Sequence, residues 1–134
     1  MLAEWNDSFS VGLATIDDQH KILFGIINKL NHGIMESRGR QTLGWVLEEL
    51  VDYAAVHFKT EEDLMRLHSY PDLAEHKGQH DTMNMKLMEF QKRYKAGQED
   101  ISLEVLMELI DWLHEHMGGS DSKLAPYLGE KGVR

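Results

Sequence analysis

Apolar residues recur at every third or fourth position through most of the chain, as they do on the buried face of an α-helix. Short segments that contain glycine or proline interrupt this period at residues 38–40, 69–72 and 96–97. Such interruptions are typical of turns between helices, so the pattern predicts four helices. The apolar stripes that define them run over residues 16–34, 43–64, 73–94 and 105–117.

Residues that favour the start or the end of a helix indicate where the predicted helices begin and end. Asp17 and Asp18 favour a start near residue 16, and Thr42 is a candidate cap for the second helix. The third helix is expected to end at Gly97, because glycine commonly terminates helices. The predicted helices therefore span about residues 16–37, 42 to the turn at 69–72, 71–96 and 102–117.

The connections between these helices are short, which implies an antiparallel bundle. The predicted fold class is all-α, an antiparallel four-helix bundle that forms one domain over residues 1–134. Residues 1–15 have no sustained helical period and are expected to form an extended N-terminal arm packed on the bundle. After Met117, a pair of glycines is expected to loosen or end the helix, and Pro126 to forbid a long continuation.

The amino-acid composition limits the kinds of function that this chain could have. The chain has a formal net charge of −9, which argues against nucleic acid and against an anionic membrane surface as partners. It has no cysteine, so any metal must be held by nitrogen and oxygen ligands. The N-terminal residues lack the basic flank and apolar stretch of a signal peptide, and no apolar run is long enough to span a membrane. We therefore expect a cytoplasmic protein.

Two pairs of metal-ligating residues flank the turn at residues 69–72. His57 and Glu61 are four positions apart, and so are His76 and His80. Residues at this spacing stack on one face of a helix. On two antiparallel helices joined by one turn, the pairs would direct four potential ligands at a shared volume.

The two outer helices extend this cluster. His20 lies in the apolar stripe of the first helix and His116 in that of the fourth. Asp121 is five positions beyond His116, about 140° away on an ideal helix, so both can serve one centre only if the helix unwinds between them. The candidate metal ligands are His20, His57, Glu61, His76, His80, His116 and Asp121.

Five imidazoles and two carboxylates are too many for one tetrahedral zinc. They suit two six-coordinate first-row metals bridged by the carboxylates with one position left open, and nitrogen-rich ligation without thiolate suggests iron. Burying so many ionisable groups without a metal would cost several kcal/mol. The remaining histidines, His32, His68 and His114, fall off the stripes and are assigned to solvent or to structure.

Two better-known metal motifs do not match. The segment His76 to His80 has the HxxxH spacing but lacks the glutamate of the HExxH zinc proteases. A ferritin-like site is also excluded, because that class needs several bundle glutamates and two ExxH motifs.

The segments IDDQHKILFGIINKL, HFKTEEDLM, YPDLAEHKGQH and WLHEHMGGSD resemble the hemerythrins, most closely the single-domain bacteriohemerythrins, over almost the whole chain. The spacings HxxxE, HxxxH and HxxxxD are highly specific for this family. The resemblance implies an up-down-up-down bundle that holds two non-haem irons and binds dioxygen reversibly. It also implies an oxo or hydroxo bridge between the irons.

The resemblance assigns roles to individual residues. His76, His80 and His116 resemble the ligands of the coordinatively full iron, and His20 and His57 those of the iron with an open position. Glu61 and Asp121 resemble the bridging carboxylates. Four further side chains resemble the apolar residues of the oxygen pocket, although each is equally well explained as helix core: Phe58, Trp112, Leu113 and Met117.

Two positions depart from the family pattern. Met117 stands where isoleucine is expected, and Leu124 where an aromatic residue is frequent. The first expectation for function is a dioxygen carrier, store or supply protein without catalytic turnover. Two alternatives stay open: a di-iron enzyme that reduces peroxide, nitric oxide or dioxygen with a reductase as electron donor, and an oxygen sensor that acts through a separate partner. An oxygen-consuming enzyme is a further possible partner of a supply protein.

Overall fold

The computed structural model describes residues 3–5 and 7–133, apart from the side chains of residues 8, 118, 120 and 122. Within these residues every regular element is helical and no strand occurs, which confirms the predicted all-α class. None of the described helices is long and apolar enough to cross a membrane. In chain order the elements are the 3₁₀ helix η1 (Asp7–Phe9), α1 (Ala14–Met35), α2 (Arg40–Leu67), α3 (Leu73–Lys95), α4 (Leu103–His116), the π-helix η2 (Met117–Asp121) and α5 (Ser122–Glu130).

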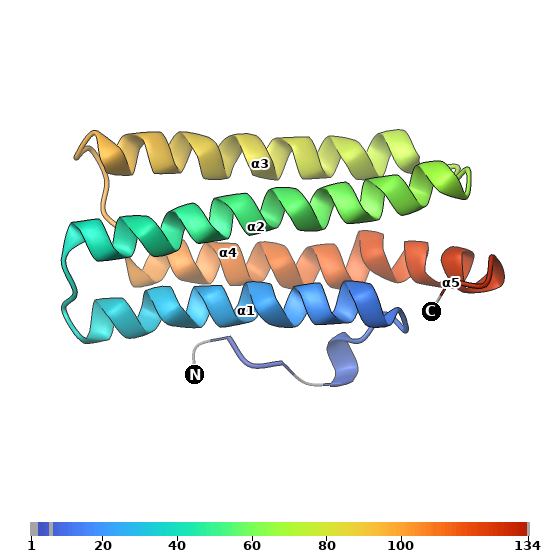
Figure 1. The fold of residues 1–134 in the computed structure, drawn as a ribbon, viewed down its shortest axis with the longest axis horizontal. Coiled ribbons are helices and arrows are strands. Elements are labelled where there is room, and N and C mark those ends of the chain that lie inside the picture. Colours follow the sequence, from blue (N-terminus) through green and yellow to red (C-terminus); the bar gives the residue numbers. More distant parts are fainter. Residues whose placement is uncertain (1–2, 6, 134) are drawn as a thin grey trace.

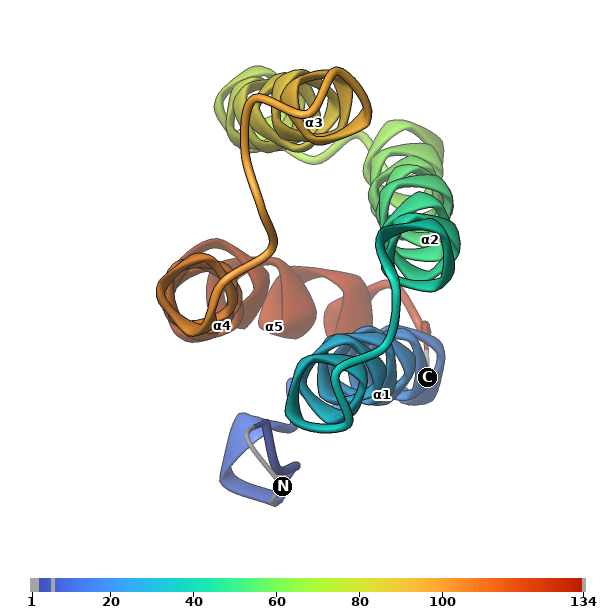
Figure 2. The ribbon, with the colours of Figure 1, turned by 90° about the vertical axis from the view of Figure 1, so that its left-hand side faces the viewer.

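The four long helices lie side by side, and the loops between them alternate between the two ends of the molecule (Figure 1). Viewed from one end, the helices surround a common interior, with α2 between α1 and α3, and α4 next to α1 (Figure 2). Each helix therefore directs one face inward, and the inward faces carry the apolar stripes seen in the sequence.

Most helix ends lie close to their predicted positions. Ser37, Ser69 and Gly97 adopt positive φ angles of 55°, 54° and 77° just beyond α1, α2 and α3, a conformation that ends a helix. Ser102 caps α4, because its side chain accepts a hydrogen bond from the backbone nitrogen of Val105. The sequence located these helix ends through the glycine and proline breaks beside them and through the capping residue Ser102.

The start of α2 differs from the prediction. The helix begins at Arg40, two residues before the predicted cap Thr42, and Gly39 at its N-cap position makes no side-chain capping bond. A tertiary contact holds this first turn instead. The Arg40 guanidinium donates to the backbone carbonyl of Tyr94, and the Tyr94 hydroxyl donates to the carbonyl of Arg40 at 2.7 Å.

The chain beyond Met117 keeps a helical path. Of the two expected effects of the glycine pair, loosening and ending the helix, the structure shows the first: residues Met117–Asp121 form a π-helix that leads directly into α5. Pro126 lies within α5 as its fifth residue, and the helix ends four residues later at Glu130. The missing N–H of Pro126 would have bonded the carbonyl of the first residue of that helix, so the cost is a single hydrogen bond near the helix start.

The N-terminal segment contacts the bundle and contains one turn of helix that the sequence did not predict, η1. The backbone N–H of Ala3 donates to the Asn28 side chain on α1, and that side chain donates back to the Ala3 carbonyl. Trp5 and Phe9 pack their rings against Phe24 of α1. Residues 1, 2 and 6 of the predicted arm lie outside the described residues.

Two apolar clusters fill the interior. The larger includes Leu23 and Phe58, and the smaller includes Ile16 and Met65. Along α1, His20 falls between Ile16 of the smaller cluster and Leu23 of the larger one, and along α2 Glu61 falls between Phe58 and Met65. The site is therefore enclosed by apolar packing toward both ends of the bundle.

Candidate metal centre

The structure brings all seven candidate ligands together at one place inside the bundle. His20 comes from α1, His57 and Glu61 from α2, His76 and His80 from α3, His116 from the last turn of α4 and Asp121 from the end of η2. Each residue is at most 3% exposed. Helical spacing explains the convergence, because every one of these positions lies on the inward face of its helix.

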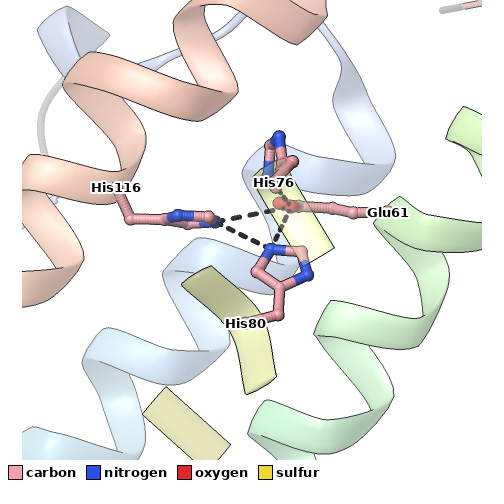
Figure 3. Close-up of side chains that lie close together, drawn as sticks. All are labelled: Glu61, His76, His80 and His116. Atoms are coloured by element: carbon pink, nitrogen blue, oxygen red, sulfur yellow. Dashed lines mark hydrogen bonds and ion pairs between the residues drawn. The ribbon is translucent and has the colours of Figure 1, made fainter. Parts of the chain in front are cut away.

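Three histidines surround one oxygen of Glu61 (Figure 3). The Glu61 Oε2 atom lies 2.9 Å from His80 Nε2, 3.0 Å from His76 Nε2 and 3.4 Å from His116 Nε2. The His80 and His116 Nε2 atoms are 3.2 Å apart. These four residues offer ligand atoms within 4.8 Å of one another, so the group could hold a metal ion.

The other oxygen of Glu61 faces a second group. Glu61 Oε1 lies 3.0 Å from His57 Nε2 and 3.8 Å from His20 Nε2. The Oδ2 atom of Asp121 lies 3.0 Å from His20 Nε2. His20, His57, Glu61 and Asp121 therefore form a second set that could hold a metal ion.

The two carboxylates belong to both groups. Asp121 directs its second oxygen, Oδ1, toward the first group, at 3.1 Å from the Nε2 atoms of His76 and His116. Glu61 and Asp121 thus each present one oxygen to each set of histidines. This is the geometry expected of carboxylates placed between two neighbouring cations.

Buried polar atoms without hydrogen-bond partners indicate whether metal cations fit this site. Among the described residues, His20 Nε2, His57 Nε2, Glu61 Oε1 and both Asp121 side-chain oxygens are buried without a hydrogen bond of acceptable geometry. A buried polar atom without a partner costs about 1–3 kcal/mol. The atoms nevertheless point at one another across short distances, so cations between them would supply the missing partners.

The carboxylates and imidazoles shift one another's pKa values strongly. Burial lowers the pKa of His76 and His116, but their close contacts with the Asp121 and Glu61 carboxylates outweigh it and raise these values to about 9 and about 10. Burial and the charge of Glu61 raise the pKa of Asp121, yet the close approach of three histidines lowers it to about 2. Burial likewise opposes the shift of Glu61, whose pKa the surrounding histidines hold well below the usual range. The cluster therefore favours carboxylates in their ionised form, the form that binds metal.

The π-helix explains how His116 and Asp121 reach the same centre. An α-helix would separate residues five apart by about 140°. In a π-helix the hydrogen bonds run from residue i to i+5, so residues at this spacing fall close to one face. The predicted local unwinding is therefore a widened turn at Met117–Asp121, with the helix continuing on both sides.

Two residues that sequence reasoning missed lie behind the histidines. Gln19 Oε1 is 2.8 Å from His57 Nδ1, and Glu62 Oε2 is 3.0 Å from His80 Nδ1. An acceptor at Nδ1 fixes the tautomer that leaves Nε2 free for a metal. The signal was present in the sequence, because each is the polar neighbour of a candidate ligand at the edge of an apolar stripe, next to His20 or Glu61.

Apolar side chains also surround the cluster. The Phe58 ring stacks on His80 with centroids 4.3 Å apart, and Trp112 stacks on His116 at 4.9 Å. Leu113 and Met117 are 3% and 2% exposed. A cavity of about 30 Å³, lined by apolar residues that include Phe58, Trp112 and Leu113, adjoins this region.

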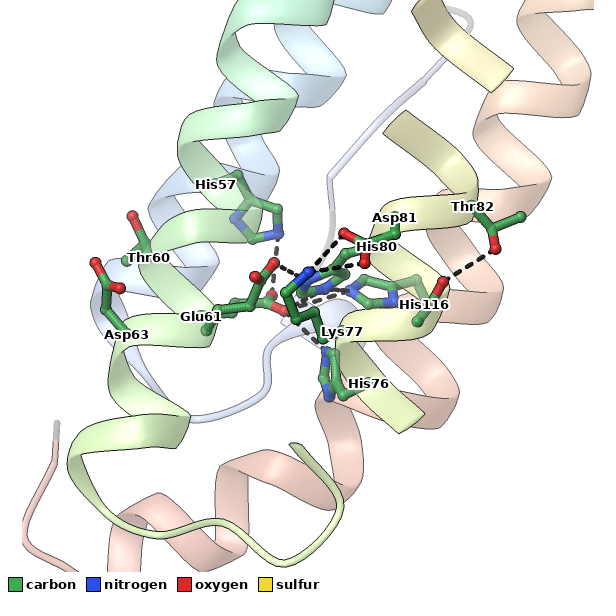
Figure 4. Close-up of polar contacts among 12 residues, drawn as sticks. His57, Thr60, Glu61, Asp63, His76, Lys77, His80, Asp81, Thr82 and His116 are labelled. Carbon is green, nitrogen blue, oxygen red and sulfur yellow. Dashed lines mark hydrogen bonds and ion pairs between the residues drawn. The ribbon is translucent and has the colours of Figure 1, made fainter. Parts of the chain in front are cut away.

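Two ion pairs near the site join neighbouring residues of one helix, and one of them, Lys77 with Asp81, is drawn beside the ligands in Figure 4. Lys77 bonds Asp81 along the exposed face of α3, and Lys59 bonds Asp63 along that of α2. The remaining histidines also stay outside the cluster. His32 pairs with exposed Glu36, the backbone carbonyl of His68 accepts from Tyr127, and the His114 ring stacks on Phe9.

Comparison with known proteins identifies the family. The model of the Hemerythrin HHE cation binding domain matches residues 11–128. The chain is 38% identical over 124 residues to a bacteriohemerythrin of Stenotrophomonas maltophilia (strain R551-3), covering 92% of this chain and 80% of that protein. It is 34% identical over 120 residues to a bacteriohemerythrin of Methylococcus capsulatus, covering 90% of this chain and 91% of that protein.

Solved structures agree with this result. The crystal structure of a wild-type hemerythrin matches with a TM-score of 0.90 and 33% sequence identity, over 96% of this chain and 98% of that one. A mutant hemerythrin, in which one leucine is replaced by alanine, matches with a TM-score of 0.88 and 32% identity, over 93% and 95% of the two chains. The family model covers most of the chain, and the relatives match most of its length and share its fold, so this chain belongs to the hemerythrin family.

Proposed function

We propose that this protein binds dioxygen reversibly at a non-haem di-iron centre and serves as an oxygen carrier, store or supply protein. Membership of the hemerythrin family supports an oxygen-binding di-iron protein. The observation that carries the proposal is the position of Glu61 and Asp121, each of which faces two groups of histidines with different oxygens. A single metal would not need two carboxylates shared in this way.

The proposed ligands divide unequally between the irons. His76, His80 and His116 would hold one iron, and His20 with His57 would hold the other. Glu61 and Asp121 would bridge them, together with an oxo or hydroxo group. The second group has one histidine fewer, so the iron that it would hold would have room for dioxygen, and the two irons would supply the electrons for reversible binding.

The chain's own residues provide the conditions for reversibility. Phe58, Trp112, Leu113 and Met117 would line the oxygen pocket and exclude water from it, because a dry pocket prevents protonation and loss of the bound ligand. Phe58 and Trp112 also hold the imidazoles of His80 and His116 by stacking on them. We place the pocket within one antiparallel up-down-up-down domain spanning residues 1–134, with its N-terminal arm packed on α1.

The testing experiment combines metal analysis with optical spectra. Protein loaded with ferrous iron without air should contain two irons per chain, develop colour on exposure to air and bleach when oxygen is removed. Irreversible oxidation instead would support the redox-enzyme alternative, and steady turnover with an added reductant would then be measured. Absence of iron would contradict the proposal.

A matched pair of histidine variants locates the site. His20→Ala removes one proposed ligand on α1 and should lower the iron content without unfolding the helices. His32→Ala changes the same residue type on the same helix, at a side chain that is 72% exposed and bonds only to Glu36 among the described contacts. It should keep two irons and the reversible colour change.

A further inference from the structure

The two proposed metal positions differ in the acceptor that lies behind one histidine of each. On one side the acceptor at His57 Nδ1 is the neutral amide of Gln19, and on the other the acceptor at His80 Nδ1 is the carboxylate of Glu62. The bond lengths, 2.8 and 3.0 Å, are similar. The charge of the acceptor is therefore the main difference between them.

The identity of the Gln19 acceptor is set by its own hydrogen bonds. The Thr60 hydroxyl donates to the backbone carbonyl of Val56 at 2.9 Å, so its oxygen accepts from Gln19 Nε2 at 3.1 Å. This directs the Gln19 carbonyl oxygen at His57. A carbonyl can only accept, so His57 Nδ1 donates and its Nε2 presents a lone pair to the centre.

Burial and a neighbouring arginine hold the Glu62 side chain in place. Its side chain is only 12% exposed, and Arg66, one helical turn later, lies 3.7 Å from its second oxygen. The Phe58 ring packs flat on His80 with an interplanar angle of 15°. The imidazole is thus fixed in the orientation that keeps its Nδ1 on Glu62 and its Nε2 at the centre.

A carboxylate behind a ligating imidazole makes that imidazole a stronger electron donor. Stronger donation stabilises the more highly charged oxidation state of the metal it binds. Resting on the function proposed above, we infer that Glu62 biases the iron held by His80 toward the ferric state, whereas Gln19 leaves the iron held by His57 easier to keep ferrous. Glu62 and Gln19 are then positioning residues that set which iron carries the extra electron.

This asymmetry concerns the half-reduced protein, because the proposed oxygen binding draws electrons from both irons. The proposed open position belongs to the iron held by His20 and His57, and dioxygen binds to ferrous iron. In a half-reduced protein the remaining electron would stay at that iron.

A reciprocal exchange of charge tests the inference. Glu62→Gln keeps the size and an accepting oxygen but removes the charge behind His80, and Gln19→Glu adds a charge behind His57. Asp63→Asn is the matched control, because Asp63 also bonds Arg66 and is next to Glu62 but contacts Lys59 and Arg66 only among the described contacts. Reduction potentials are measured by anaerobic titration, and ⁵⁷Fe Mössbauer spectra of half-reduced protein distinguish the two iron positions.

In Glu62→Gln the ferric-to-ferrous ratio of the His80 iron at a fixed potential should fall about tenfold, which corresponds to a rise of about 59 mV in its one-electron potential. In Gln19→Glu the His57 iron should shift in the opposite direction, and Asp63→Asn should leave both irons unchanged. Shifts of the same sign in the first two variants would show a loss of structure rather than a change in donor strength. That result, or an equal shift in the control, would overturn the inference.

Zinc affinity provides a readout that does not depend on iron or on oxygen binding. Competition with a chelator should show affinity about tenfold lower in Glu62→Gln and higher in Gln19→Glu than in the unmodified protein. Unchanged zinc affinities and potentials would overturn the inference while reversible oxygen binding by the unmodified protein still supported the proposed function. Opposite shifts in a protein that oxidises irreversibly would support the inference and contradict the proposed function.

Discussion

Truncation of Phe58 separates the packing role of this residue from its role at the metal centre. Phe58 is 2% exposed and contacts both the His80 ring and the cavity of about 30 Å³. Phe58→Ala should cost about 3–5 kcal/mol of folding free energy, through lost burial and the void it leaves. For a chain of 134 residues this corresponds to a fall of roughly 10–20 °C in melting temperature.

The same truncation should change the oxygen chemistry. The cavity is already about the size of one water molecule, and its apolar lining keeps it dry. Removal of the ring would enlarge it next to polar ligand atoms that can hold water. We expect the oxygenated protein to lose its reversible absorption at least about tenfold faster in air.

Leu106→Ala is the matched control. Leu106 is completely buried in α4, ten residues or about 15 Å along the helix from His116, and its truncation should cost about 2–5 kcal/mol. Melting temperatures of the metal-free variants measure stability, and decay of the oxygen-dependent absorption measures oxidation. Equal oxidation rates in the two variants would refute the reasoning, because general destabilisation would then explain the whole effect.

Three further predictions concern the centre. Met117→Ile should slow oxidation in air without changing iron content, since it removes an oxidisable thioether; an unchanged decay rate would contradict this. Glu61→Ala should lower iron content below two per chain in metal analysis, whereas Glu75→Ala, which removes an exposed carboxylate on α3, should not. The metal-free protein should lose stability between about pH 6.5 and 10, because His76 and His116 have pKa values near 9 and 10 when folded and near 6.5 when unfolded. Iron-loaded protein needs neutral imidazoles and should not follow this trend, which melting temperatures at pH 6.5 and 9.5 would show.

Much of the fold was predictable because it depends on helical period. The stripes located four helices, and the spacing of His57 with Glu61 and of His76 with His80 placed both pairs on inward faces, where the structure has them. Glycines and Ser102 marked helix ends through their local backbone chemistry. Each of these signals lies within a few residues of the feature that it predicts.

Features that depend on contacts between distant residues were harder to predict. The early start of α2 depends on a bond between Arg40 and Tyr94, which are 54 positions apart. The contact of Glu62 with His80 joins two helices whose relative rotation the sequence does not give. The effect of Pro126 depends on its position within α5, and the sequence alone does not give the residue at which that helix starts.

His116 and Asp121 can face the same centre at a spacing of five residues only because the turn at Met117–Asp121 is widened. A π-turn holds one more residue than the α-turn it replaces, so removal of Gly119 would restore the α-helical register. His116 and Asp121 would then stand four positions apart in an α-helix, the spacing that places His57 and Glu61 on one face of α2. The deletion should therefore leave Asp121 facing the histidines and the Tyr127 hydroxyl near the α2–α3 loop, although the widened turn is lost. If the full-length segment were instead forced into α-helical geometry, Asp121 would lie about 140° from His116 and would face away from the histidines. The extra residue in this turn is thus matched to the five-residue spacing of the two ligands.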